Sequence, residues 1–169
     1  MNLYLMRHGI AVAADQPGTQ SDSERPLTPK GIKRMRRAAR GLRRLGMSFD
    51  ALLTSPLVRA RQTAEIVADT LGLEAQLEEI AELAPESSVD HLISSLARFQ
   101  DKEHLLLVGH NPLLTHASSF LITGKKETSF EIELKKGGLC CIEIDGLPPG
   151  TPGTLHWFLT PKQLRQLGD

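Results

Sequence analysis

Cysteine is scarce in this 169-residue chain, which has only two, the neighbours Cys140 and Cys141. Consecutive side chains of a strand point to opposite faces, so this pair cannot close an ordinary long loop. The scarcity excludes a small scaffold held together by disulfides, and nothing in it indicates an oxidising compartment. A folded chain of this length buries about two-thirds of the surface that it exposes when unfolded. We therefore expect one domain over residues 1–169, with a core that needs no disulfide or metal.

Long apolar runs are missing as well. Near the N-terminus the only apolar stretch is Leu3 to Met6, and the charged Arg7 ends it. That stretch is too short for the apolar part of a secretion signal and for the roughly 20 residues that a membrane helix needs. We expect a soluble, cytoplasmic protein without a membrane partner. With one tryptophan and one tyrosine, the chain offers few rings for base stacking, so we expect no nucleic acid partner.

The formal net charge is zero, yet the charges are unevenly distributed. Residues 26–64 hold ten basic side chains and one acidic one, whereas residues 65–103 hold ten acidic and two basic ones. The two stretches can attract each other within the fold. Alternatively, a basic helix over residues 30–44 can dock an anionic partner. Both interpretations stay open on the sequence alone.

The hydrophobic pattern predicts short strands separated by helices. Apolar runs at 2–7, 51–54 and 104–109 are typical of buried strands, and residues 75–77 carry a weaker strand pattern. The last third of the chain, from 129 to 159, holds three pieces rich in residues that favour strands. Strands alternating with helices indicate a mainly parallel sheet covered on both faces, with an antiparallel edge built from the C-terminal pieces.

Helix starts are marked by a polar side chain that is followed by proline. The pattern occurs at Thr28, Ser55 and Asn111, and each of these residues is predicted to cap the helix that follows. A further helix is predicted from about 89 to 99. All of these helices fit between the predicted strands, as an alternating fold requires.

Three of the predicted strands lead into residues that suit an anionic ligand. They are Arg7 and His8, then Ser55 with Arg59, then His110. In an open parallel sheet, ligands bind beyond the carboxyl ends of the strands, so these residues should converge. Arg59 falls in the first turn of its helix, where a cation opposes the helix dipole unless an anion lies nearby. Two arginines around one point suit a phosphoryl group.

The two histidines suggest what happens to that group. A neutral ring nitrogen of His8 can attack phosphorus and hold the phosphoryl group transiently, while His110 can donate a hydrogen bond to the developing charge. No metal or other cofactor is expected, because the arginines and the helix N-termini supply the positive field. Taken singly, each residue also has a plainer interpretation. Arg59 alone can be a surface residue, and His110 alone can bond the backbone of its own loop.

Three segments of the chain resemble the signatures of the histidine phosphatase superfamily. They are Leu5–Gly9, Thr54–Ala64 and Val108–Asn111. Two further segments, Arg25–Thr28 and Glu82–Pro85, resemble the phosphohistidine phosphatases of the SixA type, and the similarity fades after about residue 125. The resemblance implies a three-layer α/β/α sandwich of the phosphoglycerate mutase-like kind. It further implies that His8 becomes phosphorylated, that Arg7 and Arg59 clamp the phosphate, and that His110 completes the pocket.

The general acid of the reaction stays open. In the superfamily this group lies on the loop that Glu82 occupies here, or it is an aspartate directly after the second histidine. This chain has Asn111 at the latter position, which disfavours the acid phosphatase variant. Glu82 is the candidate, although it can equally be a solvated carboxylate in an acidic stretch. A phosphorylated histidine can be protonated on its leaving nitrogen before cleavage, so it needs less help from an enzyme acid.

The sequence therefore predicts a phosphatase that hydrolyses phosphohistidine on a protein of a phosphorelay or transport system and releases inorganic phosphate. Only about ten residues separate Asp15 from Arg25, which leaves little chain to roof over the site and favours a protein substrate. One alternative is a phosphatase of the same superfamily that acts on small phosphomonoesters. The other is a binding module without catalysis, which would use the basic helix at 30–44.

Overall fold

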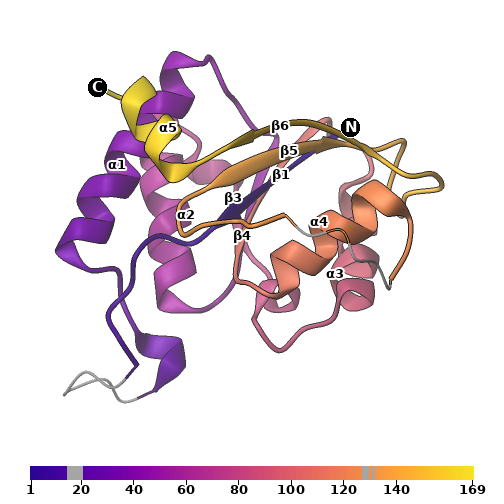
Figure 1. Ribbon diagram of the computed structural model, residues 1–169, viewed down its shortest axis with the longest axis horizontal. Coiled ribbons are helices and arrows are strands. Elements are labelled where there is room, and N and C mark those ends of the chain that lie inside the picture. The colour runs from indigo at the N-terminus through magenta and orange to yellow at the C-terminus, as the bar shows by residue number, and fades with distance from the viewer. Residues whose placement is uncertain (15–20, 127–129, 131) are drawn as a thin grey trace.

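A computed structural model describes residues 1–14, 21–126, 130 and 132–169 of the chain. Its centre is a six-stranded sheet with the strand order β3-β2-β4-β1-β5-β6 (Figure 1). The first four strands in the chain run parallel, and the last two add an antiparallel edge next to β1. The strands are β1 (Asn2–Arg7), β2 (Ala51–Thr54), β3 (Leu77–Glu79), β4 (His104–Gly109), β5 (Leu139–Glu143) and β6 (Thr154–Leu159).

Helices cover both faces of this sheet, which confirms the predicted three-layer architecture (Figure 1). One face is covered by α1 (Pro29–Arg44), α2 (Val58–Leu71) and α5 (Pro161–Leu167), and the other by α3 (Val89–Leu96) and α4 (Leu113–Thr123). The side chains of β1, β2, β4 and β5 alternate between the two cores. Leu106 packs with Met35 of α1, whereas Leu107 packs with Leu114 of α4.

Two of the three predicted helix caps are wrong. Thr28 caps α1 as expected, because its hydroxyl accepts the N–H of Gly31 at 2.9 Å. The cap position of α2 is Leu57, since the chain makes a further turn after Ser55 before the helix begins. The cap position of α4 is Pro112, and the side chain of Asn111 donates instead to a carbonyl of the loop before β5. In both places the polar side chain bonds across the fold.

The strand predictions at the weaker positions also need correction. The strand expected at 75–77 lies at 77–79, because residues 74–76 form a turn of 3-10 helix. Of the three pieces expected in the last third, two are strands, β5 and β6; the described residues of the piece before them, 130 and 132–136, form no strand. The loop from Asp15 to Arg25 lies in part outside the described residues.

The two cysteines point to opposite faces of β5, as predicted. Cys140 lies in the core beneath α3 and α4, whereas Cys141 lies in the core beneath α1 and α2. Both thiols are buried and free. Within the described part of the chain, no helix is long and apolar enough to cross a lipid bilayer.

Replacing Gly41 by alanine is expected to destabilise the fold by about 1 to 3 kcal/mol. A Cβ atom at Gly41 would lie 2.2 Å from the carbonyl oxygen of Leu164, so α5 would have to move away from α1. This clash with backbone outweighs the gain of about 1 kcal/mol that alanine brings to a helix interior. Urea unfolding measures the change. Gly146→Ala is the control, because its Cβ would meet nothing within 4 Å, and equal stability of the two variants would contradict the prediction.

Candidate active site

The carboxyl ends of β1, β2 and β4 place the predicted site residues next to one another. In the sheet register Arg7 lies opposite Gly109. These are the last residues of β1 and β4, so His8 and His110 directly follow the two strands. The backbone N–H of His8 donates to the carbonyl of Gly109 at 3.0 Å, so the two loops leave the sheet together. Ser55 joins them from β2, with its N–H donating to the carbonyl of Val108 at 3.0 Å.

His8 is held in one orientation and one protonation state. Its ring is buried, with 5% of the residue exposed, and Nδ1 lies 2.7 Å from the carbonyl oxygen of Gly9. A carbonyl can only accept, so Nδ1 carries the ring proton and Nε2 carries a lone pair. Burial, together with the nearby charges of Arg59 and Arg7, lowers the pKa of His8 from 6.5 to about 3, although the hydrogen bond to Gly9 acts in the opposite direction. The ring is therefore neutral at physiological pH.

His110 lies beside this ring, with the two ring centroids 5.0 Å apart. Its Nε2 is 2.8 Å from the hydroxyl oxygen of Ser55, which also accepts the N–H of Leu57 at 3.3 Å. The Ser55 hydroxyl has one proton and no other acceptor among the described residues, so we assign it as the donor to Nε2, and in this tautomer the proton of the neutral His110 ring lies on Nδ1. That Nδ1 is buried without a hydrogen-bond partner among the described residues. Burial, followed by the charge of Arg59, lowers the pKa of His110 to about 4.

Two arginines border the histidines. Arg59 lies in the first turn of α2 and is buried, and its guanidinium donates to the backbone carbonyl of Asp22 at 2.6 Å and to the Asp22 carboxylate at 2.9 Å. Arg7 donates to the carbonyl of Leu134 at 3.1 Å, whereas its Nε is buried without a partner in the described part of the structure. The unpaired N–H groups of Arg7 and His110 fit a ligand that accepts hydrogen bonds, such as a phosphoryl group.

Three contacts of the site escaped the sequence analysis. Asp22 binds both Arg59 and Arg25, and although partial burial raises the pKa of its carboxyl, the hydrogen bonds from these arginines hold it below the usual value. Thr63 accepts the N–H of Gly9 at 3.0 Å, which fastens the backbone after His8 to α2. Ser55 orients His110. The spacing of Asp22 three residues before Arg25 was the one available signal, since it predicts a local ion pair.

Glu82 lies at the edge of this group of residues. It belongs to a turn of 3-10 helix, Ala81–Leu83, that follows β3 and packs against the end of β4 at Gly109. The side chain is half-buried and has no hydrogen bond or ion pair with the described residues. Its part in the chemistry stays a prediction. Nor do the described residues contain a cluster of three or more His, Cys, Asp or Glu side chains that could hold a metal ion.

The low pKa values of the two histidines predict how kcat/KM changes at acidic pH. The neutral His8 ring is the predicted nucleophile, and it stays neutral at any pH well above its pKa of about 3. We expect kcat/KM, corrected for ionisation of the substrate, to hold steady as the pH falls to about 5 and to drop only below that value. A histidine with its ordinary pKa would instead produce a fall in kcat/KM near pH 6.5, and that profile would contradict the prediction.

Replacing Asp22 by asparagine is expected to tighten the binding of inorganic phosphate about three- to ten-fold. The carboxylate of Asp22 occupies Arg59 and repels an incoming anion, so its removal leaves the guanidinium charge to the ligand. The inhibition constant of phosphate as a product inhibitor measures the effect. Glu24→Gln is the control, since Glu24 lies in the same turn of 3-10 helix and does not contact Arg59. An unchanged or weaker phosphate affinity in the Asp22 variant would show that Asp22 does not compete with the ligand.

Comparison with known proteins gives a consistent result. Residues 3–84 match the family described as the histidine phosphatase superfamily (branch 1). An uncharacterized protein of Picosynechococcus is 42% identical, over 97% of this chain and 99% of the relative. Phosphohistidine phosphatase SixA of Escherichia coli is 31% identical, over 98% of this chain and 97% of that protein. The structure of the protein histidine phosphatase SixA with tungstate superposes with a TM-score of 0.81 at 30% identity, over 97% of this chain and 99% of that one. These alignments extend past residue 125, where the sequence resemblance was expected to fade.

Proposed function

Because the chain belongs to the histidine phosphatase superfamily, we propose that it hydrolyses phosphohistidine on a protein through a transient phosphoryl group on His8. The observation that carries the proposal is the hydrogen bond from Nδ1 of His8 to the carbonyl of Gly9, which leaves a lone pair on Nε2. The similarity to SixA along nearly the whole chain supports a phosphohistidine protein as substrate.

In the first step Nε2 of His8 attacks phosphorus, a new N–P bond forms, and the N–P bond of the substrate breaks. The leaving imidazole nitrogen of the substrate takes up a proton as it departs. The N–H groups of Arg7, Arg59 and His110 hold the phosphoryl oxygens, whose negative charge they stabilise during transfer. The buried and unpaired Nε of Arg7 and Nδ1 of His110 are suited to this role without any prior loss of a protein hydrogen bond.

In the second step a water molecule attacks the phosphorus on His8, and the bond from Nε2 to phosphorus breaks. Inorganic phosphate leaves and His8 regains its lone pair. We assign both proton transfers to Glu82. Its carboxyl group gives a proton to the leaving nitrogen in the first step, and the resulting carboxylate takes a proton from the attacking water in the second. No step of this mechanism uses a metal or another cofactor. Glu82 matters less for phosphohistidine than for a phosphate ester, because the leaving nitrogen can be protonated in advance.

The test is phosphate release from a histidine-phosphorylated protein, beside a phosphoserine peptide and a sugar phosphate. We expect the native protein to act selectively on phosphohistidine, and Glu82→Gln to retain most of that activity while losing its weaker activity on the esters. Glu86→Gln, an exposed carboxylate a few residues along the same segment, is the matched control. Activity confined to the sugar phosphate would move the assignment to a small-molecule phosphatase. No release from any substrate would favour the binding module that uses residues 30–44.

A further inference from the structure

A pocket separate from the group of site residues lies next to the backbone that follows His8, on the side of α1 and α5. Its volume is about 310 Å³, and it is bordered by α1, α5 and the loop residues that precede β5. Figure 1 shows α5 packed beside α1 at this end of the sheet. Five cationic side chains line the pocket and no acidic one does. They are Arg34, Lys135, Lys136, Lys162 and Arg165.

Most of these cations lack a partner. Lys135 lies 3.6 Å from Glu133, whereas the other four form no side-chain hydrogen bond or ion pair with the described residues. Burial lowers the pKa of Arg165, and the charges of Arg34 and Arg37 lower it further, against the smaller opposing effect of the Asp169 carboxylate. The cations of the pocket therefore repel one another, and an anion placed among them would relieve that repulsion.

Three other arginines of α1 are used differently. Arg37 forms an ion pair with Asp169, and Arg40 and Arg44 donate to backbone carbonyls of the last residues of the chain. These contacts fasten the C-terminus to the helix. The cations of the basic helix predicted from the sequence thus differ in their surroundings. Arg37, Arg40 and Arg44 bind the chain's own end, Arg34 lines the pocket, and others such as Lys33 are exposed outside it.

The pocket and the catalytic site share a stretch of backbone. Gly9, which follows His8, lines the pocket, and so does Gly137. The N–H of Gly137 lies 2.9 Å from the carbonyl of Arg7 and 3.1 Å from that of His8. Lys136 connects the two electrostatically, since burial and then the charges of Arg7 and the other site arginines lower its pKa. A substrate that extends from a phosphoryl group at His8 therefore has the pocket within reach.

The floor of the pocket is apolar. Met35 lies against both Gly9 and Gly137, and Ala38 and Pro161 complete the lining between the cations. A surface of cations around an apolar floor suits the side chains of a peptide, whose methylene groups pack while their carboxylates meet the rim. Several cations from three elements match several carboxylates better than they match one small anion.

We propose that this pocket binds an acidic segment of the protein substrate that flanks its phosphohistidine. The inference rests on the proposed function and deepens it, because it names the chemistry by which a phosphoprotein would be selected. Neighbouring carboxylates of the substrate would pair with Arg34, Lys162 and Arg165 while the phosphoryl group reaches His8.

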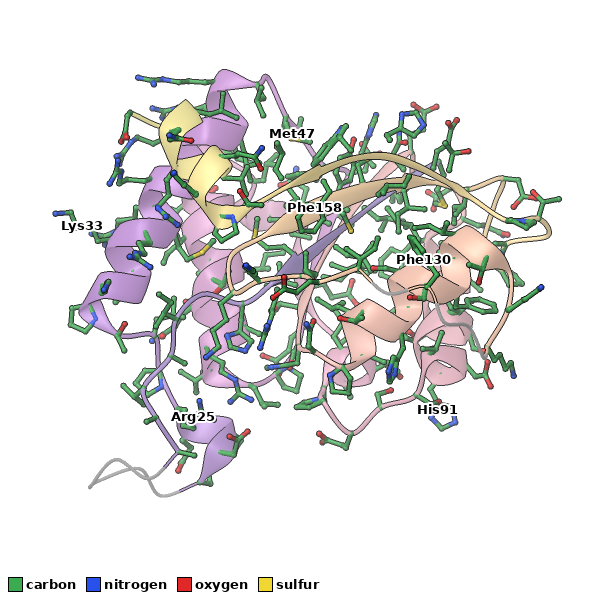
Figure 2. All side chains as sticks on the ribbon, in the orientation of Figure 1. Arg25, Lys33, Met47, His91, Phe130 and Phe158 are labelled. Carbon is green, nitrogen blue, oxygen red and sulfur yellow. The ribbon has the colours of Figure 1, made fainter. Side chains whose placement is uncertain are left out.

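The test uses two peptides of equal length with a central phosphohistidine, one flanked by Asp and Glu and the other by Asn and Gln. The pocket variant combines Arg34→Gln, Lys162→Gln and Arg165→Gln. The control variant combines Lys33→Gln, Arg36→Gln and Arg43→Gln, which removes the same charge from exposed positions of α1 outside the pocket. Figure 2 shows Lys33 projecting away from the molecule on the outer side of α1.

We expect the native protein and the control variant to favour the acidic peptide about ten-fold in kcat/KM, and the pocket variant to favour it hardly at all. Equal rates on the two peptides by the native protein would overturn the proposal. An equal loss of preference in both variants would overturn it too, because the preference would then follow from overall charge.

A binding measurement tests the pocket independently of whether the protein cleaves phosphohistidine. Fluorescence anisotropy of the labelled acidic peptide, without its phosphoryl group, reports the pocket alone. The native protein should bind this peptide more tightly than the pocket variant does, and equal binding would overturn the proposal even if phosphohistidine is cleaved. Loss of phosphohistidine cleavage together with intact selective binding would instead contradict the proposed function and leave the pocket assignment standing.

Discussion

Replacing His8 by alanine is expected to lower phosphate release from a phosphohistidine protein by at least about a thousand-fold. The variant lacks the lone pair on Nε2 that the bond from Nδ1 to Gly9 maintains in the native protein. Water would have to attack the substrate directly, with only Arg7, Arg59 and His110 to assist it. The folded state should persist, because the imidazole lies at the end of β1 and the hydrophobic cores on the two faces of the sheet do not include it.

A trapping experiment distinguishes loss of the nucleophile from general damage. Acid-stable and acid-labile phosphate on the protein are measured after brief mixing with a radiolabelled phosphohistidine substrate. We expect an acid-labile, alkali-stable adduct on the native protein and none on the His8 variant. His91→Ala serves as the control, since His91 is an exposed residue of α3 at the outer surface (Figure 2). A labelled adduct of the His8 variant with normal turnover would place the nucleophile elsewhere.

The core of the site could be predicted because its residues follow strong local patterns. Arg7 and His8 come directly after a run of apolar residues. The change from apolar to charged residues indicates that the strand reaches the edge of the sheet there. His110 follows a similar run in β4. Since parallel strands carry their carboxyl ends to one edge, two such endings are enough to indicate a shared site.

The contacts that orient these residues could not be predicted in the same way. Asp22 binds Arg59 across 37 residues of sequence, and the hydroxyl of Ser55 meets His110 across 55. A serine before proline is typical of a helix cap, so Ser55 was predicted to be one. Its contact with His110 exists only because the folded sheet brings the ends of β2 and β4 together. Thr63 reads as an ordinary residue of α2, yet it fixes the position of Gly9. Such pairings depend on how α2 packs on the sheet.

The C-terminal strands show the same limit in the fold itself. The opposite orientation of Cys140 and Cys141 follows from the alternation of any strand, whereas the sequence does not show that both faces of β5 are buried. Strand β6 pairs with β5 alone at the edge of the sheet, and its residues are exposed or half-buried. The extra strand was expected before β5, where Ile132 and Leu134 are buried although the described residues there form no strand. Alternating buried apolar residues produce the same pattern with or without a neighbouring strand, so one strand too many was predicted.

The second large effect is expected at Arg59. Replacement by methionine, which keeps much of the side-chain volume, should lower kcat/KM for phosphohistidine by about a hundred- to a thousand-fold. Arg59 is buried beside the two histidines, and its charge lowers the pKa of both rings. In the proposed mechanism it contributes twice, by holding the phosphoryl oxygens and by adding to the effect of burial, which lowers the pKa of His8. Arg61→Met is the control, because Arg61 is exposed on the same helix and pairs only with surface glutamates.

The two contributions of Arg59 can be separated with lysine. Arg59→Lys retains a positive charge but loses the planar pair of donors that binds a phosphoryl group at two oxygens. We expect the lysine variant to keep the pH profile of the native protein while KM rises and kcat falls, whereas the methionine variant should also begin to lose activity at a higher pH. That shift follows from the sign of the interaction, since removing a nearby cation lets the pKa of His8 rise and protonates more of the nucleophile at a given pH. If both variants kept the native activity, the phosphoryl group would have to bind away from Arg59, and the guanidinium would serve only to hold Asp22 in place.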